Sequence, residues 1–315
     1  MAKRGDISEG QIIDAIQRVG LRGAARELDC NLRSLAKRRR RIEQKLGQPI
    51  VGPYAAYNQS MPPPNRITDT ISDGVVIIFS DAHYWPGQIT TAHLALVKFI
   101  KELKPKIIVN CGDSIDGAII SSYAPKGFEN LPTVQGEITA NQERLSEISK
   151  AAPKAKRIYC LGNHDQRFES RLASHAPEFA RVQGTRLEDH LPDWEFCISL
   201  WLNDEVVIKH RWKGGSGATR SNALHAGKTM ITGHLHSQQS TPHTDLNGTR
   251  WGVDVGCLAE PFGPQFRYAE DNPRDWRSGF AALTFSKGRL LDPELVRVIE
   301  PGVVNFRGKL HKIGR

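Results

Sequence analysis

The stretch GVVIIFSDAH, residues 74–83, joins a short run of apolar, β-branched residues to two polar side chains. Such a run is typical of a strand buried on both faces of a sheet, so Asp81 and His83 follow its carboxyl end. Binding and catalytic sites of α/β proteins lie beyond the carboxyl ends of their strands. The stretch therefore predicts a covered α/β sheet with a polar site at one edge.

Further motifs rich in metal-ligating side chains follow later strand-like runs. They are Gly112-Asp113-Ser114-Ile115-Asp116, Gly162-Asn163-His164-Asp165, the single His210, and Gly233-His234-Leu235-His236. Carboxylate, imidazole and amide oxygen together suit a mid-to-late divalent transition metal better than calcium, which prefers oxygen ligands. Because one ion cannot use so many ligands, we expect two ions and one carboxylate that bridges them.

Each of these residues, taken singly, also has an ordinary structural interpretation. Asp81 and Asp113 could cap a helix or end a strand, and Gly162-Asn163 could form only a turn. The same strand-end context at every motif favours one shared site. Between the third and last motifs His210 competes with three other histidines, but it alone ends a β-like run, Val206–Lys209. Those competitors are His175, His190 and His225.

The order and spacing of the motifs resemble the calcineurin-like metallophosphoesterase superfamily over residues 74 to 286. The resemblance implies that one acidic residue, Asp113, bridges two metal ions. It implies that the first ion is also bound by Asp81, His83 and His236, and the second by Asn163, His210 and His234. It further implies that His164 is an acid or a transition-state stabiliser beside the phosphate and that Asp116 orients it.

The chemistry of such a site is consistent without the resemblance. Two metal ions about 4 Å apart neutralise a phosphoester and lower the pKa of a bridging water, and the resulting hydroxide attacks phosphorus in line. His164 can give the leaving oxygen a proton, and Asn163 adds a neutral ligand that keeps the ions strongly acidic. Manganese is the expected metal, and iron, zinc or nickel would also suit these ligands.

Two departures narrow the activity within the superfamily. The protein Ser/Thr phosphatases that the chain resembles continue the second motif with Asp-Arg-Gly and end the third with Glu. Here Asp116 is followed by Gly117-Ala118, and the third motif ends in Asp165. The pattern is closer to the phosphodiesterases and nucleases of the superfamily.

Charge is concentrated near the N-terminus. The chain carries a net +9, and residues 1–46 hold twelve Lys and Arg against six Asp and Glu, a net of +6. The remainder therefore carries only +3. This asymmetry predicts a basic N-terminal module that binds a polyanion.

Residues 7–46 predict three short helices, at 8–19, 21–28 and 32–46, with Gly20 separating the first two. Ala24 and Ala25 precede the turn, as in the Fis-type and resolvase-type helix-turn-helix that the segment resembles. The third helix would enter the major groove of DNA. Its candidate contacts are Arg33, Lys37, Arg38 and Arg40. A basic helical hairpin used for oligomerisation or solubility is the alternative.

The expected domain organisation is a helix-turn-helix domain at 1–46, a proline-containing linker at 47–72 and a phosphoesterase domain at 73–315. The resemblance implies a two-sheet sandwich flanked by helices, a four-layer αββα fold, for the last. We expect residues 117–138 and 260–278 to be loops that shape the substrate pocket.

The cysteines and the apolar segments of the sequence predict the cellular compartment. The five cysteines are scattered and odd in number, and the segment that starts at Met1 lacks the apolar stretch of a secretory signal. No run approaches the roughly eighteen apolar residues of a membrane span. We expect a cytoplasmic protein without a membrane partner.

The leading hypothesis is a dinuclear phosphodiesterase or nuclease that acts on DNA. The alternatives are a phosphomonoesterase or small-nucleotide phosphodiesterase localised to DNA, and an inactive DNA-binding regulator. Arg167 and Arg211 are candidates for binding substrate phosphate, although either could equally form a structural salt bridge. Tyr84 and Trp85 could stack a nucleobase, or belong only to the turn at Pro86-Gly87.

Overall fold

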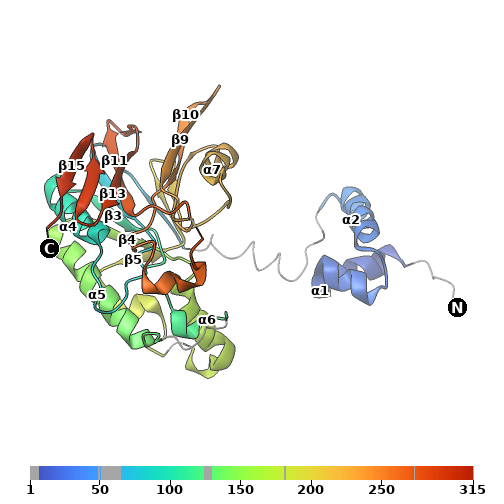
Figure 1. Ribbon diagram of the computed structural model, residues 1–315. Coiled ribbons are helices and arrows are strands. Elements are labelled where there is room, and N and C mark those ends of the chain that lie inside the picture. Colours follow the sequence, from blue (N-terminus) through green and yellow to red (C-terminus); the bar gives the residue numbers. More distant parts are fainter. Residues whose placement is uncertain are drawn as a thin grey trace. The chain divides into compact units, whose positions relative to one another are not determined.

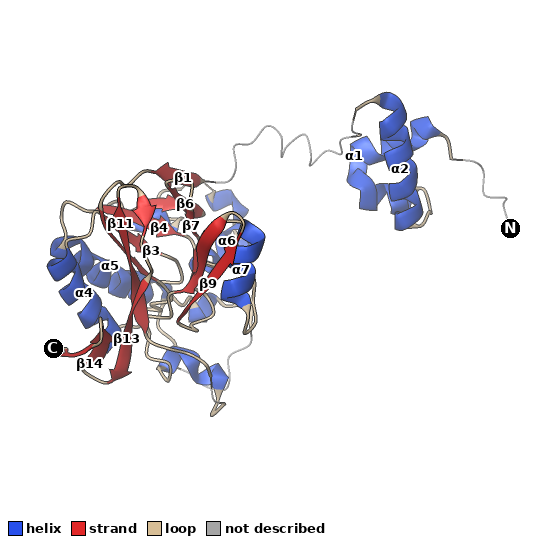
Figure 2. Ribbon diagram, turned by 90° about the horizontal axis from the view of Figure 1, so that it is seen from above, coloured by secondary structure: helices blue, strands red, loops and turns tan. Residues whose placement is uncertain are grey.

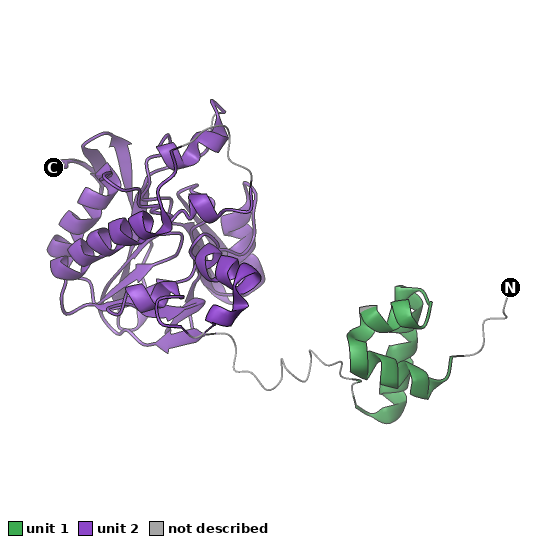
Figure 3. Cartoon of the chain, turned by 90° about the horizontal axis from the view of Figure 1, so that it is seen from below, with its two compact units in different colours: residues 1–64 green, residues 65–315 purple. Residues whose placement is uncertain are grey.

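The computed structural model describes residues 7–48, 50, 65–123, 130–180, 182–272 and 274–314. The chain forms two compact units, residues 1–64 and 65–315, which are coloured separately in Figure 3. Figure 1 gives the labels of the helices and strands.

The N-terminal unit contains the three helical segments expected from the sequence. α1 spans Glu9–Glu27 but is interrupted at Gly20, whose φ of 72° lies outside the helical region, and α2 spans Leu32–Leu46. Ser8 and Gln11 form a capping box at the start of α1, and the Asn31 side chain accepts from two amides at the start of α2. A small apolar core joins the helices, and it consists of Ile12, Ala15, Ile16, Ala24, Ala25, Leu35, Ile42 and Ile50.

The second unit is built on two sheets. The larger begins with four parallel strands, β2 (Gly74–Phe79), β3 (Ile107–Asn110), β4 (Lys156–Cys160) and β5 (Glu195–Cys197). Antiparallel strands extend it from the side of β2, and these are β11 (Gly279–Ser286), β12 (Arg289–Leu290), β13 (Glu294–Glu300), β14 (Val303–Phe306) and β15 (Lys309–Lys312).

The smaller sheet has the strand order β1-β6-β7-β8-β10-β9. Its strands are β1 (Arg66–Asp69), β6 (Ser199–Leu202), β7 (Val206–Ile208), β8 (Thr229–Thr232), β9 (Gln239–Asp245) and β10 (Gly248–Asp254). The α-helices of this unit are α4 (Thr91–Leu103), α5 (Val134–Ala151), α6 (Asp165–His175) and α7 (Ala218–Ala226). The described residues of this unit also form the 3₁₀ helices η1 (Ala118–Ile120), η2 (Pro177–Phe179), η3 (Leu187–His190) and η4 (Pro264–Ala269).

The two sheets pack face to face between helices (Figure 2). Alternate residues of β2 show the layering, because Val76 and Ile78 join the apolar cluster between the sheets whereas Ile77 and Phe79 pack in the cluster that includes α4 and α5. On the other side α7 contacts the smaller sheet. This architecture confirms the expected α/β sandwich of two sheets flanked by helices.

The strand order gathers the polar motifs at one place. Parallel β2, β3 and β4 each end directly before a motif, as do β7 and β8 of the facing sheet. Their carboxyl ends therefore deliver side chains from five chain segments to one edge of the sandwich. None of the helices in the described part of the chain is long and apolar enough to cross a membrane.

The predicted linker, residues 47–72, extends too far toward the C-terminus, because residues 66–69 form strand β1 of the second unit. β1 pairs in parallel with β6, and Ile71 is buried and donates its amide to the Asn203 side chain. A four-residue strand whose residues are alternately half-exposed has no strong apolar signal, so the sequence pattern missed it. Of the remainder, residues 51–64 lie outside the described residues, and Ile50 packs in the N-terminal core.

The two expected loops also contain regular structure. α5 begins at Val134, so residues 134–138 are helical and not part of a loop. The segment 260–278 contains η4, whose Phe266 is buried. Residues 124–129 and 273 of these segments lie outside the described residues.

Shortened chains test where the second unit begins. A chain that starts at residue 73 lacks β1 and Ile71 and should be less stable than one that starts at residue 65. Loss of one buried isoleucine and several hydrogen bonds predicts a difference of about 2–4 kcal/mol in the free energy of unfolding. Urea unfolding of both chains measures this difference, and equal stability would show that β1 contributes nothing.

Candidate metal centre

Three groups of potential ligands meet at the carboxyl edge of the strands. One contains Asp81, His83 and His236, a second Asp113, His210 and His234, and a third His83, Asp116 and His164. In each group the ligating atoms lie within 4.8 Å of one another. The first two groups contain six of the seven metal ligands expected from the sequence, divided as the family resemblance implies.

In the first group, hydrogen bonds determine which imidazole nitrogen is available. His83 Nδ1 lies 2.9 Å from Asp116 Oδ1, which leaves His83 Nε2 buried without a hydrogen-bond partner among the described residues. His236 Nε2 lies 3.1 Å from Asp81 Oδ1, and the other Asp81 oxygen accepts from the His234 amide at 2.8 Å. Asp81 thus links the first motif to the last.

In the second group, His210 Nδ1 donates to the Cys111 carbonyl at 2.7 Å. A neutral imidazole in this tautomer has its lone pair on Nε2, which lies 3.0 Å from Asp113 Oδ2 without hydrogen-bond geometry. The two atoms therefore need a positive charge between them, which either a proton on Nε2 or a cation bound by both atoms supplies. The other Asp113 oxygen accepts from the His164 amide at 2.7 Å.

Several nitrogen and oxygen atoms of the expected ligands are buried without a hydrogen-bond partner, which shows whether the site suits a cation. Of the eleven buried side-chain polar atoms without a hydrogen-bond partner in the described residues, four belong to expected ligands, namely His83 Nε2, His210 Nε2, His236 Nδ1 and Asn163 Oδ1. A buried polar atom without a partner costs about 1–3 kcal/mol, so their grouping at one place needs an explanation. Divalent ions bound by nitrogen and oxygen would satisfy them, and the residues present fit such ions.

The titratable groups of the site compensate one another electrostatically. Burial would raise the pKa of the Asp81 carboxyl, but His236 outweighs burial and lowers this pKa to about 2. The pKa of Asp113 is lowered in the same way, mainly by His210. Conversely, burial would lower the pKa of His210, but Asp113 raises it to about 9. The carboxylates are therefore ionised and available as ligands.

The backbone of the site is held in uncommon conformations. Five expected ligands have a positive φ, between 39° and 74°, and these are Asp81, His83, Asp113, His234 and His236. Such values cost residues other than glycine of order 1 kcal/mol each, and they persist only where the surroundings enforce them. Five of the thirteen non-glycine residues with positive φ in the described chain are thus expected ligands, which fits a backbone geometry that aims side chains at one point.

Two glycines let the motifs approach one another. A Cβ on Gly162 would lie 2.1 Å from Asp113 Oδ1, and one on Gly233 would lie 2.5 Å from Asp81 Oδ2. Any side chain at either position would displace an expected ligand. The glycines of the third and last motifs are therefore required by the close packing of the carboxylates.

Asp165 positions Asp113, and the sequence analysis assigned Asp165 no role. Its buried carboxylate accepts from the amides of Asp113 at 2.8 Å and Gly162 at 2.9 Å, and from the Tyr159 hydroxyl at 2.9 Å. It therefore fastens the second motif to the third. In the sequence, only its position at the end of the third motif marked Asp165 as a possible site residue.

Glu137 has a similar part on the other side of the site. Its buried carboxylate accepts from the amides of Asp116 at 2.8 Å and Gly117 at 2.6 Å, and so holds the loop that follows the bridging residue. Sequence analysis missed Glu137 because the residue was assigned to a loop. No motif marks it.

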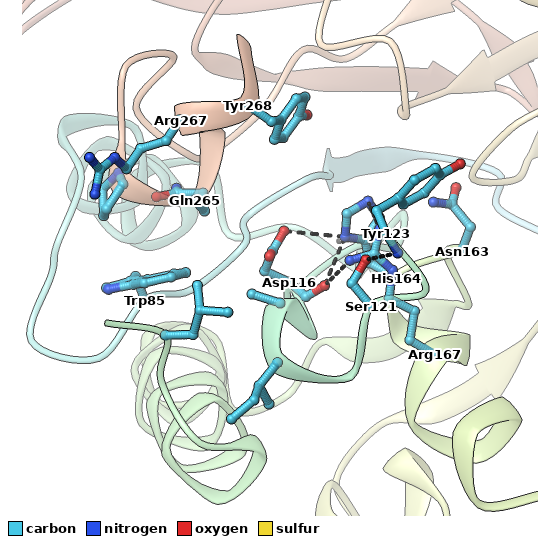
Figure 4. Close-up of a pocket in the computed structure, with 14 residues that line it drawn as sticks. Trp85, Asp116, Ser121, Tyr123, Asn163, His164, Arg167, Gln265, Arg267 and Tyr268 are labelled. Atoms are coloured by element: carbon cyan, nitrogen blue, oxygen red, sulfur yellow. Dashed lines mark hydrogen bonds and ion pairs between the residues drawn. The ribbon is translucent and has the colours of Figure 1, made fainter. Parts of the chain in front are cut away.

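His164 lies at the opening of the site (Figure 4). Its Nδ1 donates to the Asp116 carbonyl at 2.8 Å and lies 3.2 Å from Asp116 Oδ1, while Nε2 is 4.0 Å from Asp113 Oδ2. Burial would lower the pKa of His164, but Asp116 and Asp113 outweigh it and raise the pKa. Asp116 contacts both His83 and His164, so one carboxylate orients both rings.

The remaining candidates lie in different places. Arg167 donates to the Asp116 carbonyl at 2.9 Å and lines a cavity beside His164, whereas Arg211 is exposed on the segment after β7. The competing histidines are outside the ligand groups: His175 and His190 bond to nearby carbonyls, and His225 caps a turn of α7.

The candidate DNA contacts belong to the N-terminal unit. Arg33, Lys37 and Arg40 are exposed on α2. Arg38 is half-buried and donates to the Ile7 carbonyl, so its guanidinium serves the packing of the unit itself.

Metal content tests whether the two ligand groups share Asp113. Metal-reconstituted protein should hold two ions per chain. Asp113→Ala should lose both, because the resemblance implies that its carboxylate bridges the two ions, whereas His83→Ala should mainly weaken one. His175→Ala, a histidine on α6 outside the groups, is the matched control and should retain both. Elemental analysis of wild-type protein that finds one ion or none at saturation would contradict the prediction.

Comparison with known proteins identifies the family. Residues 74–238, about half of the chain, match the model of the calcineurin-like phosphoesterase family. Similar solved structures include Vps29 of Chaetomium thermophilum, at 8% identity and a TM-score of 0.40 over 76% of this chain and 100% of that one. Another is a dimetal phosphatase from Danio rerio, at 9% identity and a TM-score of 0.38 over 77% and 99%. No curated protein matches. The matched residues include all five strands that precede the motifs, the four ligand motifs and His210. The chain therefore belongs to the calcineurin-like phosphoesterase family.

Proposed function

We propose that this metal-dependent phosphoesterase is a phosphodiesterase or nuclease that acts on DNA and that its N-terminal unit binds the nucleic acid. The observation that carries the proposal is a cavity of about 810 Å³ directly beside His164 and Asn163. A phosphate at the ligand groups would have room for substituents on both of its ester oxygens there. A diester needs this room, whereas a small monoester does not.

The residues of the chain have separable tasks in this reaction. Bound metal ions would neutralise the phosphate and activate a water molecule. Asp116 orients the His164 ring, and the raised pKa keeps this imidazole protonated to higher pH, as a general acid requires. Arg167 Nη2 lies 3.2 Å from His164 Nε2, and its charge opposes the rise in the pKa of the imidazole. The guanidinium is therefore better suited to hold a phosphate oxygen beside the ring than to assist proton transfer.

The basic surface of α2 supports a nucleic-acid partner. Arg33, Lys37 and Arg40 are exposed, and helical periodicity places them opposite buried Leu35 and Ile42. Glu43, the one acidic residue of this helix, pairs with Arg39. The exposed face of α2 therefore has cations without acidic partners of the same helix, which suits a row of phosphates.

Removal of the proposed acid should separate turnover from metal binding. His164→Ala should retain both ions and reduce hydrolysis of a chromogenic diester by roughly a hundredfold or more, the usual effect of losing a positioned acid. Asp116→Asn should act in the same direction less strongly. His175→Ala should leave turnover unchanged. If His164→Ala instead strips the ions, this residue is a ligand, and faster hydrolysis of a monoester than of a diester by the wild type would favour phosphomonoesterase activity.

A charge-reversal experiment tests the DNA partner. Arg33→Glu, Lys37→Glu and Arg40→Glu in one chain should weaken DNA binding strongly and flatten its dependence on salt, because phosphate contacts release counterions. Hydrolysis of a small diester should not change, since the expected ligands lie in the other unit.

The matched control reverses three exposed lysines of the second unit, Lys101, Lys104 and Lys154, for the same change in net charge. Fluorescence anisotropy with labelled DNA over a range of salt concentrations measures both variants. Equal loss in the two variants would mean that net charge alone attracts the DNA, and unchanged binding in the α2 variant would contradict the proposed partner.

A further inference from the structure

The cavity beside the metal centre has two chemically different sides (Figure 4). One side holds His164, Asn163 and Arg167, with Tyr123 beside them in Figure 4. The other side is lined by Trp85, Gln265, Arg267 and Tyr268, so aromatic rings and an amide lie there together with one guanidinium. A phosphate on the first side would therefore have an organic substituent on the second.

Trp85 is placed by the first ligand motif. The amide of the preceding residue, Tyr84, donates to the Ser114 carbonyl at 2.9 Å, and its hydroxyl lies 3.0 Å from His93 Nδ1. Tyr84 is therefore buried in the core, while half-buried Trp85 lines the cavity. The indole is two residues from His83, so its distance from the metal centre is fixed by the backbone.

The opposite wall is held by η4. Its buried Phe266 packs edge-on against two expected ligands, with ring centroids 5.2 Å from His83 and 5.4 Å from His236. This contact fastens Gln265 and Tyr268, the neighbours of Phe266 that line the cavity, to the metal centre. Both walls of the cavity are therefore attached to His83, one through the backbone that leads to Trp85 and the other through Phe266.

Gln265 is a polar group without its expected partner. The side chain is only 8% exposed, and its Oε1 has no hydrogen-bond partner within the described chain. A buried acceptor without a partner is costly, and rotation of this side chain toward the cavity that it lines would bring the amide within reach of a ligand's donor. A Cβ on Gly263 would lie 2.5 Å from this oxygen, so the chain leaves space that only glycine allows around the amide.

We propose that this side of the cavity binds one unpaired nucleobase next to the scissile phosphate. Aromatic side chains bind bases through their π-faces, and an amide reads the base edge that is otherwise used for pairing. A paired base has both faces stacked and this edge occupied, so the site takes a free nucleotide or a single-stranded segment. The inference rests on the proposed phosphodiesterase activity and names its substrate class.

Ligand binding tests the base site without relying on turnover. Isothermal titration of full-length, manganese-loaded protein compares deoxycytidine 5′-monophosphate, whose amine can donate to Gln265 Oε1, with 2-deoxyribose 5-phosphate, which has no base. Wild type should bind the nucleotide roughly tenfold or more tightly than the sugar phosphate. Trp85→Ala should remove most of that preference while leaving sugar-phosphate affinity unchanged, and Gln265→Leu should reduce it.

Trp212→Ala is the matched control, since this half-exposed tryptophan does not line the cavity. It should keep the preference of wild type. Equal affinity of wild type for the two ligands would overturn the base site, as would a preference that survives Trp85→Ala. A preference that Trp85→Ala abolishes, in a protein that hydrolyses no diester, would keep the base site and reject the proposed activity.

Oligonucleotides distinguish the two sources of an unpaired base. Tighter binding of a single-stranded oligonucleotide than of the mononucleotide, with the same loss in Trp85→Ala, would assign the site to a strand, and the reverse order would assign it to a free nucleotide. Faster cleavage of a duplex than of the single strand of the same sequence would overturn the requirement for an unpaired base.

Discussion

The burial of several carboxylates at one edge of the sandwich is the constraint on which the rest of this structure depends. Asp81, Asp113 and Asp116 are each at most 5% exposed. Ionised carboxylates are stable in such a place only when positive charge and hydrogen-bond donors surround them. Imidazoles and backbone amides provide part of this compensation, and the unpartnered nitrogen and oxygen atoms between them indicate that divalent cations complete it.

The same constraint explains features of the chain that are far from the metal centre in sequence. Asp165 and Glu137 hold the loop of the second motif by its amides, and glycine at 162 lets two motifs touch. Phe266 joins the loop before β11 to the ligand imidazoles, which connects the geometry of the substrate cavity to that of the ions. Ligand placement, backbone strain and cavity shape are therefore parts of one arrangement.

Much of the fold and of the metal centre could be predicted from the sequence, because potential ligands that follow apolar runs mark both the strands and the site. Five motifs located the ligand groups, and Gly20 located the break in α1. Contacts between distant segments left no local pattern. β1 is too short to show a period, Glu137 lies in the first turns of a helix whose start was taken for a loop, and Gln265 matters only through the cavity around it. Arg38 looked like its basic neighbours, but tertiary packing engages it with Ile7.

The central claim is that both ligand groups act as one centre through Asp113. Electron paramagnetic resonance of protein reconstituted with manganese tests it most directly, because two Mn²⁺ ions that share a carboxylate are magnetically coupled. The account predicts the spectrum of a coupled pair at two ions per chain, and its replacement by weak or isolated-ion signals in Asp113→Ala. Two uncoupled ions in the wild-type protein, or a coupled pair that survives Asp113→Ala, would contradict it.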